Sequence, residues 1–388
     1  MHHHQPGRLI AQLLIVATGV CCQPAAAQQS VPTGAEIEDG LAVVGGTKAD
    51  AEKKPEAKSD LLIVPIPQAS PSLGFGAVVT ASMFYNPNQS KEPWITGVGV
   101  MRTSNKSWAV GALHKMSFEQ DRFRLGLFAG YGDINMDFYG IGSSAGNRDR
   151  SIGLNEKGYA AAAQGQVRVA PNLYLGARAL LLDLSTRVRH DDPQFPDAEI
   201  PTAQFDSRLV KVGPAITYDR RDNSLSPSNG ELVNAFWLFG IRGLGGDYTH
   251  NKFTLNGAIY RRLGASTVIA GRASLCVVSG GAPFYDLCMY GSSSDLRGYE
   301  AGRYRDGAYW AAQLELRQKL SGRFGAVAFA GIGESTMDLS HFGKGKFLPA
   351  GGAGLRYQPS KETPINLRVD FALGKDSRAL YIGIGEAF

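Results

Sequence analysis

The residues of this sequence best suited to specific chemistry are Arg297 and Glu315. Arg297 lies in the segment Leu296-Arg297-Gly298-Tyr299, inside a glycine-rich stretch that begins at Gly291. Glu315 lies in an alternating segment, in which polar residues share one face of a strand and leucines share the other. A guanidinium that is removed from water needs a carboxylate partner, because an isolated buried charge is costly. If the Arg297 segment is buried, Glu315 is the expected partner, and the ion pair would join the two segments.

Patterns for catalysis and metal binding are weak. The sequence has no Gly-x-Ser-x-Gly elbow, and its histidines beyond the N-terminus, at positions 114, 190, 250 and 341, have no metal-ligand spacing. We therefore expect no catalytic residue, no metal and no cofactor. A Ser–His dyad stays open as an alternative, because its two members need not be adjacent in sequence.

A second polar cluster has the composition of a tight turn. It runs from Tyr218 to Gly230 and contains Asp219, Arg221, Asp222, Asn223 and Pro227. Asn, Pro and Gly at these offsets suit a reversal of the chain between two strands. We expect the charged residues to hydrogen-bond one another and the turn backbone. A braced turn is the favoured interpretation, and a rim that contacts a substrate is the alternative.

The composition favours a transmembrane β-barrel. The 388 residues include 48 glycines, 10% aromatic residues and only 19% charged residues, whereas globular domains average about 25% charged residues. Beyond the N-terminus no apolar run is long enough for a membrane-spanning helix. A barrel strand needs no such run, because its apolar lipid-facing residues alternate with polar lumen-facing residues. The net charge of +5 is small and the basic residues form no cluster, so no nucleic-acid partner is expected.

Both ends of the chain carry patterns of export. Arg8, the apolar run 9–20 and the small residues 25–27 predict a signal peptide over residues 1–27. Residues 28–71, rich at first in Ala, Lys and Glu, are expected to form a flexible periplasmic arm. The last residues alternate like a strand. They resemble the C-terminal sorting strand of outer-membrane barrels, carried here by Tyr381, Ile382, Ile384 and Phe388.

Two cysteines, Cys276 and Cys288, remain after removal of the predicted signal peptide. They precede the Leu296-Arg297 tip. In an oxidising periplasmic or surface setting such a pair can form a disulfide. We expect a bridge at the root of a long loop, with two unrelated thiols as the alternative.

Residues 72–388 divide into sixteen predicted antiparallel strands, a number that is reached only with a short strand at 135–142. Because an open edge cannot face lipid, the first strand, 72–85, is expected to pair with the last, 378–388. Short turns such as Ser104-Asn105 and Gly264-Ala265 are expected at the periplasmic end. Longer connections are expected at the external end, near 86–93, 143–157, 190–205 and 280–308.

The Leu296–Tyr299 tip, the Glu315 strand and the Tyr218–Gly230 turn together resemble the BamA/TamA family of bacterial outer-membrane proteins. The resemblance implies an all-β, 16-stranded transmembrane barrel in the outer membrane, whose Arg297 loop folds back into the lumen. Many family members have a second acid in a Phe-x-Asp-x-Gly motif, where this chain has Gly331. Its replacement is expected among Glu334, Asp306 and Asp295. Family members carry POTRA domains ahead of the barrel, and residues 28–71 leave no room for one, so the POTRA-less branch is expected.

The same resemblance implies a role in outer-membrane protein assembly or translocation, without enzymatic activity. The expected partners are outer-membrane lipid, a nascent outer-membrane or secreted polypeptide, and a periplasmic protein acting in trans. Two alternatives stay open, namely a passive or selective pore and a structural surface antigen without transport. The join between the first and last strands, which opens laterally in some family members, is the expected site of gating.

Overall fold

The protein is described by a computed structural model over residues 60–70, 73–90, 93–148, 150–189, 205–223, 226–291, 295–358 and 366–388. The expected signal peptide, the arm up to residue 59 and His190 lie outside these residues. Within them, no helix combines the length and the apolar character needed to cross a membrane.

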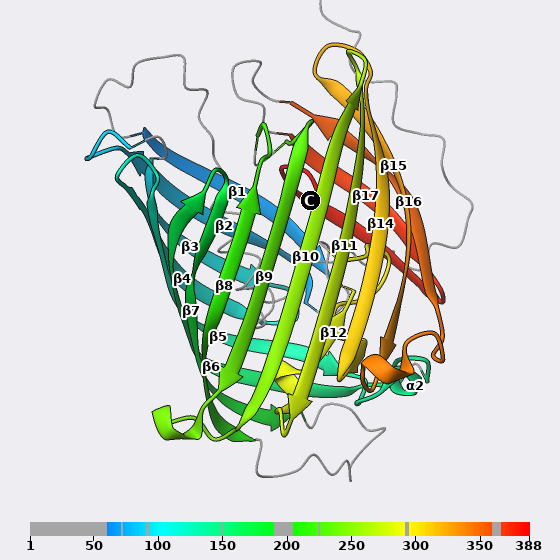
Figure 1. Cartoon of the computed structure of the whole chain (residues 1–388). Helices are drawn as coiled ribbons and strands as arrows, with labels where there is room; N and C mark the ends of the chain where they lie inside the picture. Colours follow the sequence, from blue (N-terminus) through cyan, green and yellow to red (C-terminus); the bar gives the residue numbers. More distant parts are fainter. Residues whose placement is uncertain are drawn as a thin grey trace, which may run out of the picture.

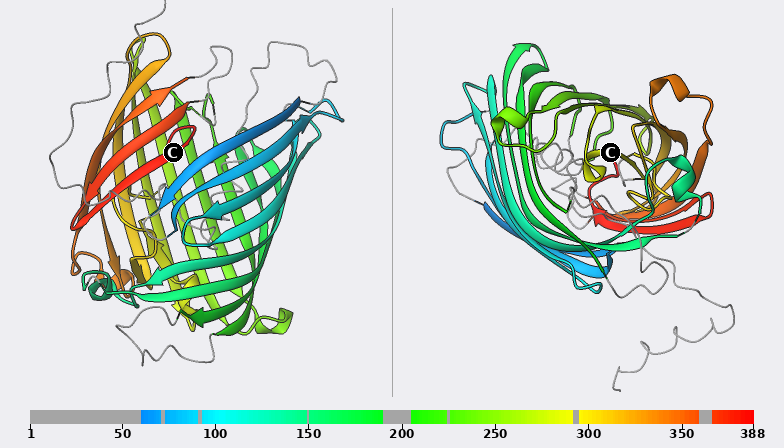
Figure 2. Two further views of the ribbon diagram at one scale, coloured as in Figure 1. Left: turned by 180° about the vertical axis from the view of Figure 1, so that it is seen from behind. Right: turned by 90° about the horizontal axis from the view of Figure 1, so that it is seen from below.

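Sixteen strands form one antiparallel sheet that curls into a nearly closed barrel (Figures 1 and 2). The sheet order follows the sequence, and β11 pairs with β14 directly. The barrel strands are β1 (Asp60–Ser70), β2 (Gly74–Tyr85), β3 (Trp94–Thr103), β4 (Trp108–Phe118), β5 (Phe123–Phe138), β6 (Ile152–Ala170), β7 (Leu173–Val188), β8 (Asp206–Asp219), β9 (Gly230–Gly240), β10 (His250–Leu263), β11 (Thr267–Gly280), β14 (Ala308–Lys319), β15 (Phe324–Thr336), β16 (Leu348–Tyr357), β17 (Leu367–Gly374) and β18 (Ser377–Ile384).

The connection from β11 to β14 carries secondary structure of its own. Its two short strands, β12 (Cys288–Tyr290) and β13 (Tyr304–Asp306), pair with each other and not with the barrel. The helices of the described chain are each of one turn, namely α2 (Ser143–Gly146), η2 (Arg242–Leu244), η3 (Phe284–Asp286) and η4 (Leu339–His341).

The strands bury one face and expose the other, as alternation predicts. On β14 the side chains of Leu314 and Leu316 are exposed on the outer surface, whereas Gln313, Glu315 and Arg317 are buried. Successive side chains of a strand point to opposite faces, so the buried set faces the lumen. The predicted division of this strand between lipid and lumen is confirmed.

The number of strands is as predicted, but two of the predicted strands are wrong. The predicted strands 122–132 and 135–142 are replaced by the single strand β5 (Phe123–Phe138), which pairs with β6 without a break at Ile134. The prediction lacks β1, because its residues are assigned there to the arm. The predicted first strand, 72–85, corresponds to β2. Pro65 and Pro67 hid β1, because proline usually argues against a strand, yet it is tolerated in an edge strand.

These two corrections move two connections to the other end of the barrel. Antiparallel strands alternate in direction, so the Ser104-Asn105 turn lies at the same end as the long β11–β14 connection. The 86–93 connection lies at the opposite end, with the short turns. The sequence analysis predicted the opposite placement, with Ser104-Asn105 at the periplasmic end and the 86–93 connection at the external end. Gly264-Ala265 lies at the short-turn end, as predicted.

Among the described residues, no strand pairing closes the barrel. β1 and β18 lie beside each other, yet the described strands form a sheet that starts at β1 and ends at β18 without a ladder between them (Figure 2). Other neighbours pair over many residues, as in Phe123–Phe138 of β5 against β6. We call the β1–β18 junction the seam.

The last residues leave the sheet. β18 ends at Ile384, and Phe388 packs against the lumenal Tyr260, with 6.5 Å between ring centres. The tail is drawn inward by Glu386, which accepts a hydrogen bond from Arg356 Nε at 2.6 Å. The expectation that Phe388 ends the strand is therefore wrong. Tyr381 and Ile382 lie on β18 as expected, and the side chain of Ile384 lies outside the described part.

Candidate functional site

The most unusual part of the barrel is the connection between β11 and β14, described over residues 281–291 and 295–307, which we call the inward loop. It turns into the lumen and fills part of the barrel's cross-section (Figure 2, right). Its side chains Cys288, Tyr290, Arg297 and Tyr299 have no exposed surface. The inward position implied by the family resemblance is therefore what the structure has.

The Arg297 guanidinium is held by two carboxylates and an aromatic ring. Its Nη2 donates to Glu315 Oε2 on β14, the predicted partner, and its Nη1 donates to Asp370 Oδ2 on β17 at 2.5 Å. The guanidinium carbon lies 3.5 Å from the centre of the Phe329 ring on β15. Its Nε donates to Gln313 at 3.3 Å. The tip of the inward loop is thereby attached to three strands, and we call this contact set the Arg297 anchor.

The second carboxylate comes from a residue that the sequence analysis did not single out. Of the expected replacements, Glu334 accepts from Trp310 and Asp306 accepts from the Ser143 amide, while Asp295 is buried in the loop tip. A Cβ on Gly331 would collide with Leu296 and lie 2.5 Å from Ala312 O. The leucine of the tip therefore fills the space that a side chain at position 331 would need, and Asp370 of β17 supplies the second carboxylate.

Restoring an acid at position 331 is expected to destabilise the barrel. Gly331→Asp forces a side chain into filled space, and overpacking of this kind costs about 1–3 kcal/mol. Urea unfolding in detergent micelles measures the loss. Leu296→Ala in the same chain is expected to recover part of it, because it removes the colliding methyl group. Unchanged stability of Gly331→Asp would contradict the close packing of Leu296.

The residue after the arginine must be glycine. Gly298 has φ of +125°, and a Cβ there would lie 3.0 Å from both Ala350 Cβ and Leu373 O. Its amide donates to Tyr381 Oη at 2.9 Å. Tyr299 donates through its hydroxyl to Pro349 O at 2.6 Å. The tip is thus bound to β16 and β18 as well.

A chain of charges leads from the Arg297 anchor to the turn motif. Glu315 Oε1 accepts from Arg317 Nε at 2.6 Å, and Arg317 Nη1 donates to Pro227 O at 3.0 Å. Asp370 also binds Arg356. The two motifs of the sequence that carry the family resemblance are therefore in physical contact through Arg317.

The turn itself is braced as expected. Asp219 accepts from Arg221 Nε at 3.0 Å and Nη2 at 2.9 Å, and Asn223 accepts from the Ser226 amide at 2.8 Å. Burial alone would raise the pKa of Asp222, but hydrogen bonds from Ser228 and from the amides of Asn229 and Asn223 hold that pKa below its ordinary value. Gly230 has φ of +106°.

A second buried ion cluster holds the other end of the inward loop. Asp286 of η3 accepts from Lys211 Nζ on β8 at 2.6 Å and lies 2.7 Å from His250 Nε2 on β10. Lys252 Nζ is 3.4 Å away. Burial raises the pKa of Asp286, but the two lysines and His250 outweigh it and hold the pKa well below its ordinary value. We call these four residues the Asp286 anchor.

The outer side of the inward loop is covered by the connection between β5 and β6. Tyr139 Oη donates to Glu300 at 2.7 Å, and Arg303 Nε donates to Gly146 O at 3.0 Å. The Ser143 amide donates to Asp306 at 3.1 Å. The inward loop is therefore fixed between the barrel wall and a second external connection.

Cys276 of β11 and Cys288 of β12 form a disulfide at the root of the inward loop, which is the arrangement expected from the sequence. Replacing both by serine is expected to lower the free energy of unfolding by about 3 kcal/mol, because a short cross-link restricts the unfolded chain. Urea unfolding with and without reductant measures this. A wild-type protein equally stable under both conditions would contradict the prediction.

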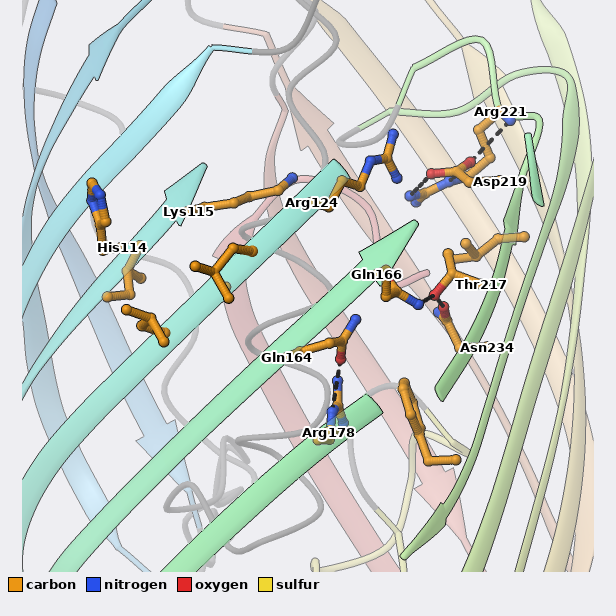
Figure 3. Close-up of a pocket in the computed structure, with 16 residues that line it drawn as sticks. His114, Lys115, Arg124, Gln164, Gln166, Arg178, Thr217, Asp219, Arg221 and Asn234 are labelled. Atoms are coloured by element: carbon orange, nitrogen blue, oxygen red, sulfur yellow. Dashed lines mark hydrogen bonds and ion pairs between the residues drawn. The ribbon is translucent and has the colours of Figure 1, made fainter. Parts of the chain in front are cut away.

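The wall near the turn motif carries a small cavity of about 80 Å³. Lys115, Arg124, Gln164 and Gln166 point into the same space from β4, β5 and β6 (Figure 3). Arg178 on β7 donates to Gln164 at 2.8 Å and lies 3.7 Å from the centre of the Phe236 ring. No group of three or more His, Cys, Asp and Glu suited to a metal occurs in the described part of the chain.

Several residues of the site were missed in the sequence. Asp370 and Arg368 alternate with Leu367, Val369 and Phe371, a pattern that places both charges on the lumenal face. This alternation predicts that both side chains face the lumen, but it does not predict which residues of distant strands they contact. The missed residues of the two anchors are Gln313, Phe329, Asp370, Lys211, His250, Lys252 and Asp286.

Comparison with known proteins agrees with this geometry. A family model described as the Omp85 superfamily domain matches residues 81–388. Among solved structures, BamA from Haemophilus ducreyi lacking POTRA domains 1–3 has 17% identity and a TM-score of 0.55, covering 83% of this chain and 67% of that one. CdiB from Escherichia coli has 12% identity and a TM-score of 0.59, with 87% and 66% coverage.

CdiB from Acinetobacter baumannii has 11% identity and a TM-score of 0.51, with 84% of this chain and 64% of that chain covered. The chain thus spans about two thirds of the length of these structures, and the likeness concerns the barrel fold. No curated protein matches the sequence. The match over most of the barrel, together with the sixteen strands and the inward loop, shows that the chain belongs to the Omp85 superfamily.

Proposed function

We propose that this protein assembles or translocates polypeptides at the bacterial outer membrane, acting as a gated barrel and not as an enzyme. The observation that carries the proposal is the seam. A polypeptide that leaves a barrel sideways, or adds to it as a strand, needs an edge whose backbone groups are free to pair. The unpaired β1–β18 junction offers such an edge.

The prolines of β1 explain why the seam stays unpaired. Residues two apart in a strand point their backbone N–H groups to the same edge, and proline has none. Pro65 and Pro67 therefore remove two donors from a single edge. Because β1 is aligned with β2 along its whole length, we infer that this edge is the one facing β18.

The anchors of the inward loop fit the same role. Arg297, Gly298, Tyr299 and Glu315 act as a latch that keeps the lumen occupied while the seam moves. The turn residues from Asp219 to Gly230 brace the latch through Arg317. The substrate is a nascent outer-membrane or secreted polypeptide, delivered by a periplasmic partner in trans.

Locking the seam tests this function. Disulfides introduced between β1 and β18 are expected to abolish assembly, measured as the protein content of outer membranes from cells that depend on this chain. A control lock between Ala235 of β9 and Leu255 of β10, which face each other in a paired junction, is expected to leave assembly intact. Full assembly with a verified seam lock would overturn the proposal. Ion conductance without any change in outer-membrane content would favour a pore.

The converse change closes the seam without a covalent bond. Replacing Pro65 and Pro67 by valine restores two donors, each adding about 0.5–1.5 kcal/mol if it pairs with β18. We expect higher stability in urea and slower assembly. Pro214→Val on β8, which lies inside the sheet between β7 and β9, is the control. Faster or unchanged assembly in the double variant would contradict the assigned role of the prolines.

A further inference from the structure

The short-turn end of the barrel has a cavity of about 330 Å³ between the turn motif and the C-terminal tail. Its walls come from β10, β11, β14, β15 and β16, close to the points where these strands meet their turns. The volume lies at the lower end of the range for ligand sites, about 300–1,000 Å³. The cavity therefore has room for a short segment of a bound molecule, and we call it the mouth cavity.

Basic side chains dominate the lining of the mouth cavity. Among the described residues that line it, Glu386 is the only acidic one, against five basic ones, namely Arg262, Arg317, Lys319, Arg323 and Arg356. Arg262, Lys319 and Arg323 are exposed. Within the described part of the chain, no ion pair joins any of these three to a carboxylate. A concave site with an excess of one charge attracts ligands of the opposite charge.

The buried cations of the mouth cavity already hold a polypeptide carboxylate. Glu386 of the tail accepts from Arg356 Nε at 2.6 Å and from Asn366 Nδ2 at 2.7 Å. It also lies 3.9 Å from Arg317 Nε. The backbone oxygen of Phe388 accepts from Arg317 Nη2 at 2.8 Å. The chain's own tail thus shows which chemistry these cations recognise, namely an acidic side chain on a peptide backbone.

We propose that the mouth cavity binds an acidic segment of the polypeptide that the barrel handles. The proposal rests on the proposed function and names the chemistry by which the substrate is recognised. The carboxylates of the segment pair with Arg262, Lys319 and Arg323, the cations that the tail leaves without an acidic partner. Arginine suits this task, because its planar fork can donate two parallel N–H groups to one carboxylate.

A phosphate-bearing lipid headgroup is the rival anion, and two observations favour the peptide. The group seated beside the cavity is a carboxylate of a polypeptide, Glu386. Arg317, which lines the cavity, belongs to the lumenal face of β14 and also donates to Pro227 O of the turn motif. The cavity therefore reaches toward the lumen, whereas lipid headgroups surround the outer face of a barrel.

Fluorescence anisotropy with the purified full chain in detergent micelles tests the site. The probes are short labelled peptides in which serine alternates with glutamate, glutamine or lysine. The glutamate peptide is expected to bind at least about tenfold more tightly than the glutamine peptide. Added salt is expected to weaken it, because exposed charges are screened. Equal affinity for the glutamate and glutamine peptides, or no binding of either, would overturn the proposal.

A matched pair of double variants locates the binding. Lys319→Gln with Arg323→Gln is expected to weaken binding of the glutamate peptide by about tenfold. Lys344→Gln with Lys346→Gln removes the same charge from exposed positions between β15 and β16, at the other end of the barrel, and is expected to leave the affinity unchanged. All four side chains are exposed, so folding is not at risk. An equal loss in both double variants would indicate a diffuse effect of net charge and would exclude the site.

Removing the competing carboxylate has the opposite sign. Glu386→Gln is expected to strengthen binding of the glutamate peptide by about fivefold, because Arg317 and Arg356 then become available to it. Glu119→Gln, whose side chain is 61% exposed in the β4–β5 turn at the same end, is the control and is expected to change nothing. An unchanged affinity in Glu386→Gln, or an equal gain in both variants, would contradict the assignment.

Competition separates the two kinds of anion. Unlabelled glutamate peptide is expected to displace the probe at lower concentrations than glycerol phosphate does, and the reverse order would assign the cavity to a lipid headgroup and overturn the proposal. Binding is measured without assembly. A failure here therefore leaves the seam-lock experiment unaffected, and a failed seam-lock experiment leaves the binding result unaffected.

Discussion

Arg297→Met is expected to produce one of the largest losses of stability of any single substitution in the inward loop. The change removes the cation between Glu315 and Asp370, both of which have essentially no exposed surface. Removing one partner of a buried pair costs about 3–5 kcal/mol. We expect the lower part of this range, because Arg317 and Arg356 still contact the two carboxylates. Equilibrium unfolding in urea, in micelles or lipid vesicles, measures the loss.

A control separates the buried anchor from ordinary surface charge. Arg261→Met breaks the pair with Glu231, whose arginine is about half exposed, and exposed pairs contribute about 0–1 kcal/mol. Adding Glu315→Gln and Asp370→Asn to Arg297→Met is not expected to recover the loss, because the buried Arg317 and Arg356 then lose their carboxylate partners. A single Arg297→Met variant as stable as wild type would mean that the anchor does not hold the loop.

Asp286→Asn is expected to have an effect of similar size at the other end of the inward loop. Asp286 is the common partner of Lys211, His250 and Lys252, all buried. The substitution leaves these basic groups with a neutral amide, and the expected cost is again about 3–5 kcal/mol. Asp183→Asn, which breaks an exposed pair with Arg208, is the matched control in the same unfolding measurement.

The Asp286 anchor also predicts a pH dependence. The folded protein holds the pKa of Asp286 below that of the unfolded chain, which is about 3.9. Stability from this carboxylate is therefore complete above pH of about 4 and is lost as the pH falls further, because the unfolded chain takes up the proton first. The difference in unfolding free energy between wild type and Asp286→Asn should shrink below that pH. A difference that stays constant from neutral pH to pH of about 3 would contradict this.

Local pattern was enough to predict much of this barrel. Alternation assigned the two faces of β14. The family resemblance placed Arg297 in the lumen, and the cost of a buried guanidinium then predicted its pairing with Glu315. β1 was not predicted because it contains Pro65 and Pro67. Proline argues against a strand that is paired on both sides, but it is tolerated in an edge strand such as β1. That error and the continuous β5 compensated in the strand count, so the total was right while two connections were assigned to the wrong end.

What the sequence could not supply was long-range pairing. Asp370 meets Arg297, and Leu296 fills the space above Gly331; no sequence motif indicates either contact. Asp286 meets its three partners because η3 lies against β8 and β10. The tail from Gly385 to Phe388 continues a strand-like pattern, yet Glu386 binds Arg356 and draws the tail into the lumen. Each case depends on which strands a fold brings together.

The central claim, that the inward loop is latched inside the lumen, is tested most directly by thiol accessibility. In a chain with Cys21 and Cys22 replaced by serine, Leu296→Cys probes the buried tip and Met337→Cys probes an exposed external position. Labelling by a membrane-impermeant maleimide is expected to be about tenfold or more slower at the tip, and to accelerate when Arg297→Met is added. Equally fast labelling at both positions, with Arg297 intact, would contradict the latch.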